Sequence, residues 1–324
     1  MKLSYFASPA SLLVLFTLTA PVTARAEIWL VPAETNFSGD SPTVAIDASN
    51  SDDLLSYGRA INLEQITAIA PDGANVTLDN AVRGRSRSAF ELRLTQPGTT
   101  RVVTSNSNVR GTYVVNGKTY RLDTFRRPGA GPGGANGPAQ PGQGGQQGPG
   151  AGARPPGANG GPPPGAGSRP LAGLPGGRPL PGVSDPSQIP AGATEIKLVQ
   201  ASARSETFIT RGAPTDWKPT GRGLELVPGG TPPTDVVVDE AATFKFSFDG
   251  KPAAGAEVEV ASANERFQTT STKLMLKADA NGLVTVKWPS AGVYWMNATA
   301  EGPGTIANAV RHGEYTTTVL VQKP

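Results

Sequence analysis

The chain has 324 residues with 40 glycines, 31 prolines, no cysteine and a net charge of +3 at neutral pH. This length allows two domains and a linker, and the lack of cysteine excludes disulfides, thiolate metal sites and a cysteine nucleophile. Two of the basic residues, Lys2 and Arg25, lie in the first 26 residues, so the remainder is nearly neutral. The charge therefore gives no reason to expect nucleic-acid binding.

Residues 1–26 have the features of a secretory signal peptide. Lys2 precedes an apolar run over 12–20, and Ala24-Arg25-Ala26 forms a small-x-small cleavage site. The apolar run is shorter than the ~20 residues that cross a bilayer. We expect cleavage before Glu27 and a periplasmic or secreted protein that does not span the membrane. A buried first helix or an uncleaved anchor is the alternative.

The next segment, 27–127, predicts a β-sandwich of short strands. Alternating apolar and polar residues predict strands over 43–48 and 90–94, and a further short strand is expected over 101–103. The strongest hairpin signal is Asn116-Gly117, between apolar runs on either side. Turn residues recur every 8–12 positions, which is typical of a sandwich.

Glycine and proline dominate residues 128–190, which contain no aromatic residue and no apolar periodicity. Such a segment cannot bury enough surface to offset its ordering entropy. We expect a disordered Gly/Pro-rich linker that would let the two flanking domains move independently, or let one domain stay docked while the other samples. A ligand for a proline-binding partner is the alternative, since residues 162–164 are consecutive prolines.

The last segment, 191–324, again predicts strands separated by turns. Residues 243–248 alternate aromatic and polar side chains as a half-buried strand does, and Asp249-Gly250 follows as a turn. About seven strands are expected in this segment, as in an immunoglobulin-like sandwich. The predicted fold class is therefore all-β, with two immunoglobulin-like β-sandwich domains joined by the disordered linker.

Several stretches of both domains resemble one bacterial family. They are IWLVP (28–32), RSAFEL (87–92), QPGT (96–99), GLELVP (223–228), FKFSFDGKPAAGAEV (244–258), ADANG (278–282) and SAGVYW (290–295). The chain resembles the domain-of-unknown-function family associated with the NikM-type periplasmic component of nickel uptake. The resemblance covers both domains and omits the linker, and its motifs are moderately specific.

The resemblance implies export, a β-sandwich fold and a link to uptake of nickel or cobalt, with a membrane uptake component as partner. Members of this family usually carry a histidine just before the tryptophan of the first motif. Here that stretch is Glu27-Ile28-Trp29, which has no histidine. The sequence thus lacks an imidazole, a usual ligand for these metals, at that place.

A transition-metal site would have to use the single histidine, His312, together with carboxylates. Glu314 lies two residues further on, so both side chains would share a face of a strand. Glu27 would add its carboxylate and, after cleavage, a new α-amino group. The candidate metal ligands are therefore Glu27, His312 and Glu314; the alternative for His312 is a solvated side chain in the loop before the last strand.

Two further groups of residues have both a binding and a structural interpretation. Arg83, Arg85 and Arg87 would line one face of a strand for an anionic partner, or would protect an edge strand by charge. The tryptophans would stack on a sugar or fill the core, and Trp217 is the one that we expect to be most exposed. The four tryptophans are Trp29, Trp217, Trp288 and Trp295.

Catalytic signals are weak. A Ser-His-Asp triad would have to use His312, and the sequence contains no Gly-x-Ser-x-Gly motif. We therefore expect an exported, non-enzymatic binding or accessory protein with no catalytic residue, linked through its resemblance to transition-metal uptake. A structural or adhesive module and a carbohydrate-binding module are the alternatives. An exposed apolar edge strand without a concave polar pocket would favour the adhesive module.

Overall fold

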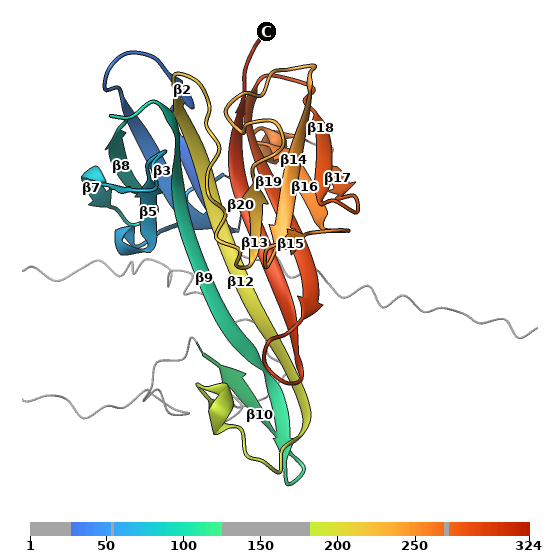
Figure 1. Cartoon of the computed structure of the whole chain (residues 1–324). Coiled ribbons are helices and arrows are strands. Elements are labelled where there is room, and N and C mark those ends of the chain that lie inside the picture. Colours follow the sequence, from blue (N-terminus) through green and yellow to red (C-terminus); the bar gives the residue numbers. More distant parts are fainter. Residues whose placement is uncertain (1–26, 53–54, 125–181, 269–271) are drawn as a thin grey trace, which may run out of the picture.

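The computed structural model describes residues 27–52, 55–124, 182–268 and 272–324, and Figure 1 shows how they are arranged. The predicted signal peptide lies outside the described residues. Within these ranges every regular element is a strand, apart from three short 3-10 helices, η1 (Leu63–Gln65), η2 (Pro186–Gln188) and η3 (Glu265–Phe267). No helix in them is long and apolar enough to cross a membrane. The all-β prediction is confirmed.

The first sheet covers one side of the molecule. Its strands lie in the order β1-β3-β8-β7, with β4 also paired to β3. Every pairing in this sheet is antiparallel, and β7 forms an edge. The bounds are β1 (Glu27–Pro32), β3 (Thr43–Ser51), β4 (Arg59–Ala60), β7 (Asp79–Arg83) and β8 (Ser88–Arg93).

The central sheet runs through the whole molecule in the order β11-β10-β9-β12-β20-β19-β16-β17. Strands β2 and β5 pair with β12 and β9, and β6 pairs with β5. The bounds are β2 (Asn36–Phe37), β5 (Ile66–Ile69), β6 (Asn75–Val76), β9 (Gly98–Val115), β10 (Lys118–Asp123), β11 (Gly182–Val183), β12 (Thr194–Arg211), β16 (Glu257–Ser262), β17 (Leu274–Lys277), β19 (Gly292–Pro303) and β20 (Ala309–Val321).

The third sheet covers the opposite face of the central sheet. Strands β13, β14 and β15 follow one another, and β18 pairs with the other edge of β14. The alternating aromatic residues predicted to form a half-buried strand lie in β14, where Phe244 and Phe246 are fully buried. The bounds are β13 (Leu224–Val227), β14 (Ala241–Phe248), β15 (Lys251–Pro252) and β18 (Leu283–Lys287).

The three sheets form two β-sandwiches, as the sequence predicts. Side chains of the first sheet, among them Leu30 and Phe90, pack on Val102 and Ile209 of the central sheet. Side chains of the third sheet pack on the other face, with Phe208 in their core. Each core excludes apolar surface from water, which is the main favourable contribution to folding.

Strand β12 belongs to both sandwiches at once. Consecutive side chains of a strand point to opposite faces, and here Ile209 enters the first core while Phe208 enters the second. Strand β12 also pairs with β9 along its length, from Lys197 opposite Thr112 to Arg211 opposite Gly98. The expectation that the two domains move independently is therefore wrong, because one continuous sheet passes through both.

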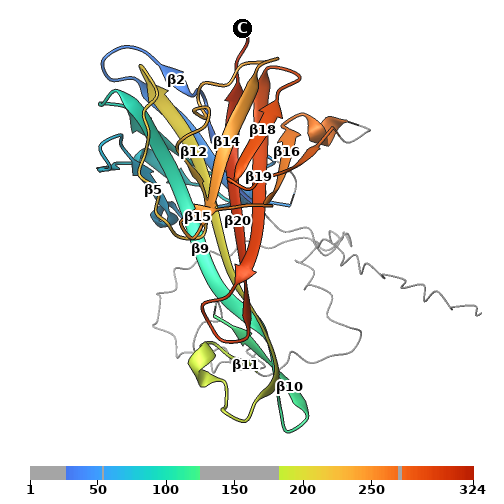
Figure 2. The ribbon, with the colours of Figure 1, turned by 45° about the vertical axis from the view of Figure 1, so that its right-hand side comes forward.

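Beyond the sandwiches, the paired strands continue as a projection that we call the finger, residues 105–123 and 194–204. It includes the lower halves of β9 and β12 and the whole of β10, and Figure 2 shows it leaving the body. At its tip, Asn116 and Gly117 have φ angles of 49° and 70°. These left-handed values are those of a type I′ hairpin turn, so the predicted hairpin is confirmed.

Most of the predicted linker lies outside the described residues, which end at 124 and resume at 182. Its last nine residues are described and carry structure. Strand β11 pairs in parallel with β10 at Arg121 and Leu122, and η2 follows. The Asp185 carboxylate caps η2 by accepting from the Ser187 amide at 2.8 Å, a favourable N-terminal arrangement. This part of 128–190 was expected to be unstructured.

Candidate functional site

A polar groove of about 670 Å³ lies where the finger meets the second sandwich. Strands β9, β12 and β20 form its floor, and the loop before β13 forms its wall. Apart from Leu224, Ala203 and Gly223, the lining side chains are polar. The lining residues are Ser105, Asn106, Ser107, Gln200, Ser202, Ala203, Arg204, Thr220, Arg222, Gly223, Leu224, Arg311 and Glu314.

Three arginines from separate segments meet in this groove. Arg204 lies on β12, Arg222 on the loop before β13, and Arg311 on β20. The Arg311 guanidinium is 2.8 Å from the Asp249 carboxylate and 5.6 Å from the Phe248 ring centroid. The Arg222 side chain is exposed and makes no ion pair within the ranges that the structure describes.

A buried ion network supports the groove from beneath. The Glu206 carboxylate is fully buried and lies 3.3 Å from both Arg101 and Arg204. Burial raises the pKa of Glu206, while the two guanidinium groups oppose that rise. Burial and the nearby Glu206 carboxylate also hold the pKa of Tyr315 well above its usual value. The network fixes the position of Arg204, whose side chain is only 14% exposed.

The wall of the groove is fixed by a second buried carboxylate, Glu225. It accepts hydrogen bonds from the Thr220 amide at 2.9 Å, the Thr220 hydroxyl at 2.8 Å and the Gly221 amide at 2.7 Å. Gly223 follows with a φ of +68°, and a Cβ there would lie 3.2 Å from the Ser202 hydroxyl. Only glycine adopts this conformation without steric cost, so the wall is held close to the floor.

The structure places the predicted metal ligands on two strands of the first sandwich and the central sheet. Glu27 is the first residue of β1, and His312 and Glu314 both lie on β20. His312 Nδ1 is 3.5 Å from the Glu301 carboxylate, and the imidazole is 25% exposed. The prediction that His312 lies in a loop before the last strand is therefore wrong, because His312 lies in β20 and pairs with β12 on one side and β19 on the other.

The described residues contain no group of three or more His, Cys, Asp or Glu residues that could hold a metal ion. His312 and Glu314 share a strand face, as predicted, and Glu314 lines a small cavity together with Ile28 of β1. The Glu27 side chain lies outside the described ones, so a metal site formed by Glu27, His312 and Glu314 stays a prediction.

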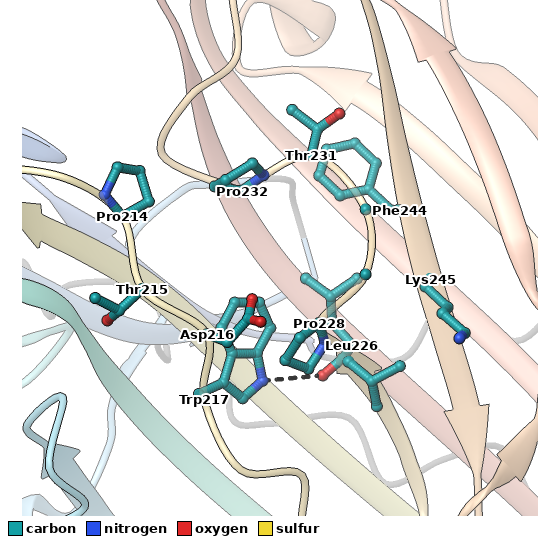
Figure 3. A pocket seen from close by; sticks show the side chains of 13 residues that line it. Pro214, Thr215, Asp216, Trp217, Leu226, Pro228, Thr231, Pro232, Phe244 and Lys245 are labelled. Carbon is teal, nitrogen blue, oxygen red and sulfur yellow. Dashed lines mark hydrogen bonds between the residues drawn. The ribbon is translucent and has the colours of Figure 1, made fainter.

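The tryptophans mostly fill the cores. Trp29, Trp288 and Trp295 are buried, as the structural interpretation predicts. Trp217 is half-buried, and its indole nitrogen donates to the Leu226 carbonyl at 3.3 Å (Figure 3). Its ring centroid is 4.7 Å from that of Phe208. The pocket beside it has a volume of about 50 Å³, room for one or two waters rather than a sugar ring.

The three arginines near residue 85 do not form a strip on one strand. Strand β7 ends at Arg83 and β8 begins at Ser88, so Arg85 and Arg87 lie in the turn between them. Arg87 Nη1 donates to the Asp47 carboxylate at 2.9 Å and to the Tyr57 hydroxyl at 3.0 Å. The interpretation as a single-faced anion strip is wrong, whereas β7 is an edge strand, as the alternative requires.

Among the groove residues, the sequence pointed only to Glu314, as a candidate metal ligand, because no local motif joins the others. Arg204, Arg222 and Arg311 belong to three segments that only the folded sheet brings together. The one available signal was Gly221-Arg222-Gly223, where two glycines flank an arginine in a loop.

Comparison with known proteins gives little beyond the family. No curated protein matches this chain. Among solved structures, the D0-D1 domain of intimin is 10% identical over 90% of this chain and 97% of that one, with a TM-score of 0.18. An ICAM-5 D1-D4 ectodomain fragment is 9% identical over 92% of this chain and 51% of that one, also with a TM-score of 0.18. Scores this low carry no argument about fold or function.

A family model does match most of the chain, over residues 26–302, from the start of the first sandwich into β19 of the second. The resemblance noted from the sequence is therefore correct at the level of the domain, and the match itself contains no reference to nickel. The chain belongs to the family described as domain of unknown function DUF4198.

Proposed function

We propose that this protein is an exported, non-enzymatic binding protein and that the groove between the finger and the second sandwich holds its ligand. One observation carries the proposal: a concave polar site of about 670 Å³ on the central sheet. Small-molecule sites commonly have volumes of ~300–1,000 Å³. Export follows from the sequence features of residues 1–26, and the periplasm is the compartment that we propose.

The chemistry of the groove supports binding rather than catalysis. A general acid or base must come within hydrogen-bond reach of its substrate. Glu206 and Glu225 are almost completely buried and already bonded to protein groups. Glu314 is the one accessible carboxylate among the described groove residues, and glycosidases normally need two.

The test is calorimetric titration of residues 27–324 with panels of neutral sugars, sugar acids, amino acids and dicarboxylates. Ser105→Trp places a large side chain into the groove from an exposed position on β9. It should abolish binding of any ligand found. Thr119→Trp, an exposed position on β10 away from the groove, is the matched control and should bind normally. Equal binding by both variants would exclude the groove as the site.

An adhesive or structural role has one specific observation in its favour. Edge strand β17 is exposed at three of its four residues, with Met275 65% exposed and Leu274 37% exposed. An exposed apolar edge can add a strand from a partner. If β17 mediates self-association, sedimentation will show oligomers that Met275→Lys converts to monomers. The coexistence of this edge with a concave polar groove ranks adhesion second.

A link to transition-metal uptake rests on the sequence resemblance alone, and we retain it as a proposal about a partner. The protein would then act beside a membrane uptake component and would need no metal of its own. Uptake of nickel and cobalt by cells that lack the chain is the direct test. Unchanged uptake would remove the link and would leave ligand binding at the groove unaffected.

A further inference from the structure

We propose that the groove recognises a small anionic molecule that also carries several hydroxyl groups. This inference rests on the proposed function and adds the chemical class of the ligand. The shared chemistry is one anionic group, a carboxylate or a phosphate, on a hydroxylated body. Two features of the groove support this inference. One is that its three arginines differ in how far nearby carboxylates compensate their charge, and the other is the set of hydrogen-bonding groups on its floor.

The positive charges of the groove are not equally available. Arg204 is compensated by Glu206 at 3.3 Å and by Glu225 at 3.8 Å. Arg311 is compensated by Asp249 at 2.8 Å. Arg222 has no acidic partner among the described residues, and its backbone is anchored because its amide donates to the Thr220 hydroxyl at 3.3 Å. One uncompensated guanidinium thus faces the groove, which also contains the Glu314 carboxylate on β20, and this guanidinium suits one anionic group.

The floor offers hydrogen-bonding groups spaced along two paired strands. Ser105 lies opposite Arg204, and Ser107 lies opposite Ser202, so the side chains of each pair share the groove face. Gln200 Oε1 accepts from the Thr305 amide at 3.0 Å and the Thr305 hydroxyl at 2.9 Å. This assignment turns the Gln200 amide nitrogen, with its two donors, away from Thr305.

Two buried polar atoms at the groove have no hydrogen-bond partner in the described part of the chain. They are the Ser202 hydroxyl oxygen and Arg311 Nε. An unsatisfied buried donor or acceptor costs free energy unless water or a ligand completes its bonds. Ligand hydroxyls are both donors and acceptors, so they can satisfy a hydroxyl and a guanidinium nitrogen alike.

Three probes that differ only at one carbon test the proposal on residues 27–324 by calorimetry: D-glucuronate, D-glucose 6-phosphate and D-glucose. We expect at least one anion to bind about tenfold or more tightly than glucose, because a charged hydrogen bond to Arg222 is lost with the neutral sugar. The stronger of the two anions identifies the carboxylate or the phosphate as the preferred group.

Arg222→Ala should weaken binding of the preferred anion by about tenfold and leave the affinity for glucose unchanged. Arg222→Lys should restore part of the affinity, and Arg85→Ala, an exposed arginine on the first sandwich, should change nothing. Equal binding of all three probes, no binding of any, or an Arg222→Ala variant that binds normally would overturn the inference. The proposed function fails separately, if Ser105→Trp leaves every bound ligand of the wider panel unaffected.

Discussion

The two halves of the β9–β12 pair differ sharply, although they belong to the same two strands. In the body, residues 98–104 and 205–210 are buried without interruption. In the finger, residues 105–107 are exposed and the rest of β9 is mostly half-buried. The body half is covered by a sheet on each face, whereas the finger half has no third layer.

This difference separates the structural task from the binding task. The buried half contains threonines as well as apolar side chains, and it satisfies them internally: the Thr99 and Thr210 hydroxyls are 3.0 Å apart, and those of Thr210 and Thr234 are 2.7 Å apart. Buried polar groups need such partners. The open half carries Ser105 and Ser107 of the groove, which are exposed to solvent or a ligand.

The largest effect is expected in the body half. Phe208→Ala removes a side chain that is 1% exposed from the second core, and it should lower the free energy of unfolding by about 3–5 kcal/mol. Because β12 serves both sandwiches, we expect both to unfold together. Denaturant unfolding followed by tryptophan fluorescence and by hydrogen exchange will measure the loss.

Trp29 reports on the first sandwich and Trp288 on the second, so single Trp→Phe variants at these positions separate the two signals. One transition seen by both probes is the expected result. Two transitions, with only the second sandwich weakened by Phe208→Ala, would mean that the shared strand does not couple the domains.

The next effect concerns the pH dependence of stability at Glu206. Burial raises the pKa of its carboxyl in the folded state, so the folded protein retains that proton to higher pH than the unfolded chain. The stability from this group is present below the ordinary glutamate pKa of ~4.3 and is lost as the pH rises through the folded value. Relative to Glu206→Gln, the wild type should therefore become less stable as the pH rises above about 4.

Asp279 is a control of opposite sign. Its carboxylate accepts from the Leu283 and Asn281 amides, which lowers its pKa. Its stabilising contribution is present above the ordinary aspartate pKa and is lost as the pH falls. The lower stability of Asp279→Asn relative to wild type should therefore disappear in acid. If the wild type instead became more stable relative to Glu206→Gln as the pH rises, the charges of Arg101 and Arg204 would outweigh burial in setting the pKa of Glu206.

Elements with a regular pattern could be predicted from the sequence. Alternation at Phe244 and Phe246 gave the right strand with the right face buried, and Asn116-Gly117 gave the right hairpin. The full length of β9 could not be found, because only 101–103 and the run 113–115 before the hairpin looked like strands, and the serines and asparagines between them have no apolar period. Their strand conformation comes from pairing with β12.

The shared position of β12 and the groove could not be predicted for a related reason. Ser205, Glu206 and Thr207 are polar, yet they are buried by two different layers. The apolar and polar pattern of a strand indicates which of its faces is buried. It does not indicate which distant segments of the chain will cover that face. Arg204 and Arg311 are brought together by the parallel pairing of β12 with β20, a contact far apart in sequence.

A smaller effect is expected in the finger. Ser107→Ala removes an exposed hydroxyl and should change the free energy of unfolding by no more than about 0.5 kcal/mol. Amide exchange in residues 105–115 should nevertheless be faster than in 98–104, because open strands exchange through local fluctuations. Equal protection of both halves would show that the finger is as rigid as the body.

The smallest effect is expected at the predicted metal ligands. His312 Nδ1 faces Glu301, and the described residues hold no cluster of three metal-binding side chains. Calorimetric titration of residues 27–324 with nickel or cobalt should therefore give no tight one-to-one binding that His312→Ala removes. Glu314→Gln serves as a second variant on the same face of β20. Tight binding lost in both variants would instead mean that the α-amino group exposed at residue 27 completes a site with them, since a nitrogen donor there would replace the missing imidazole.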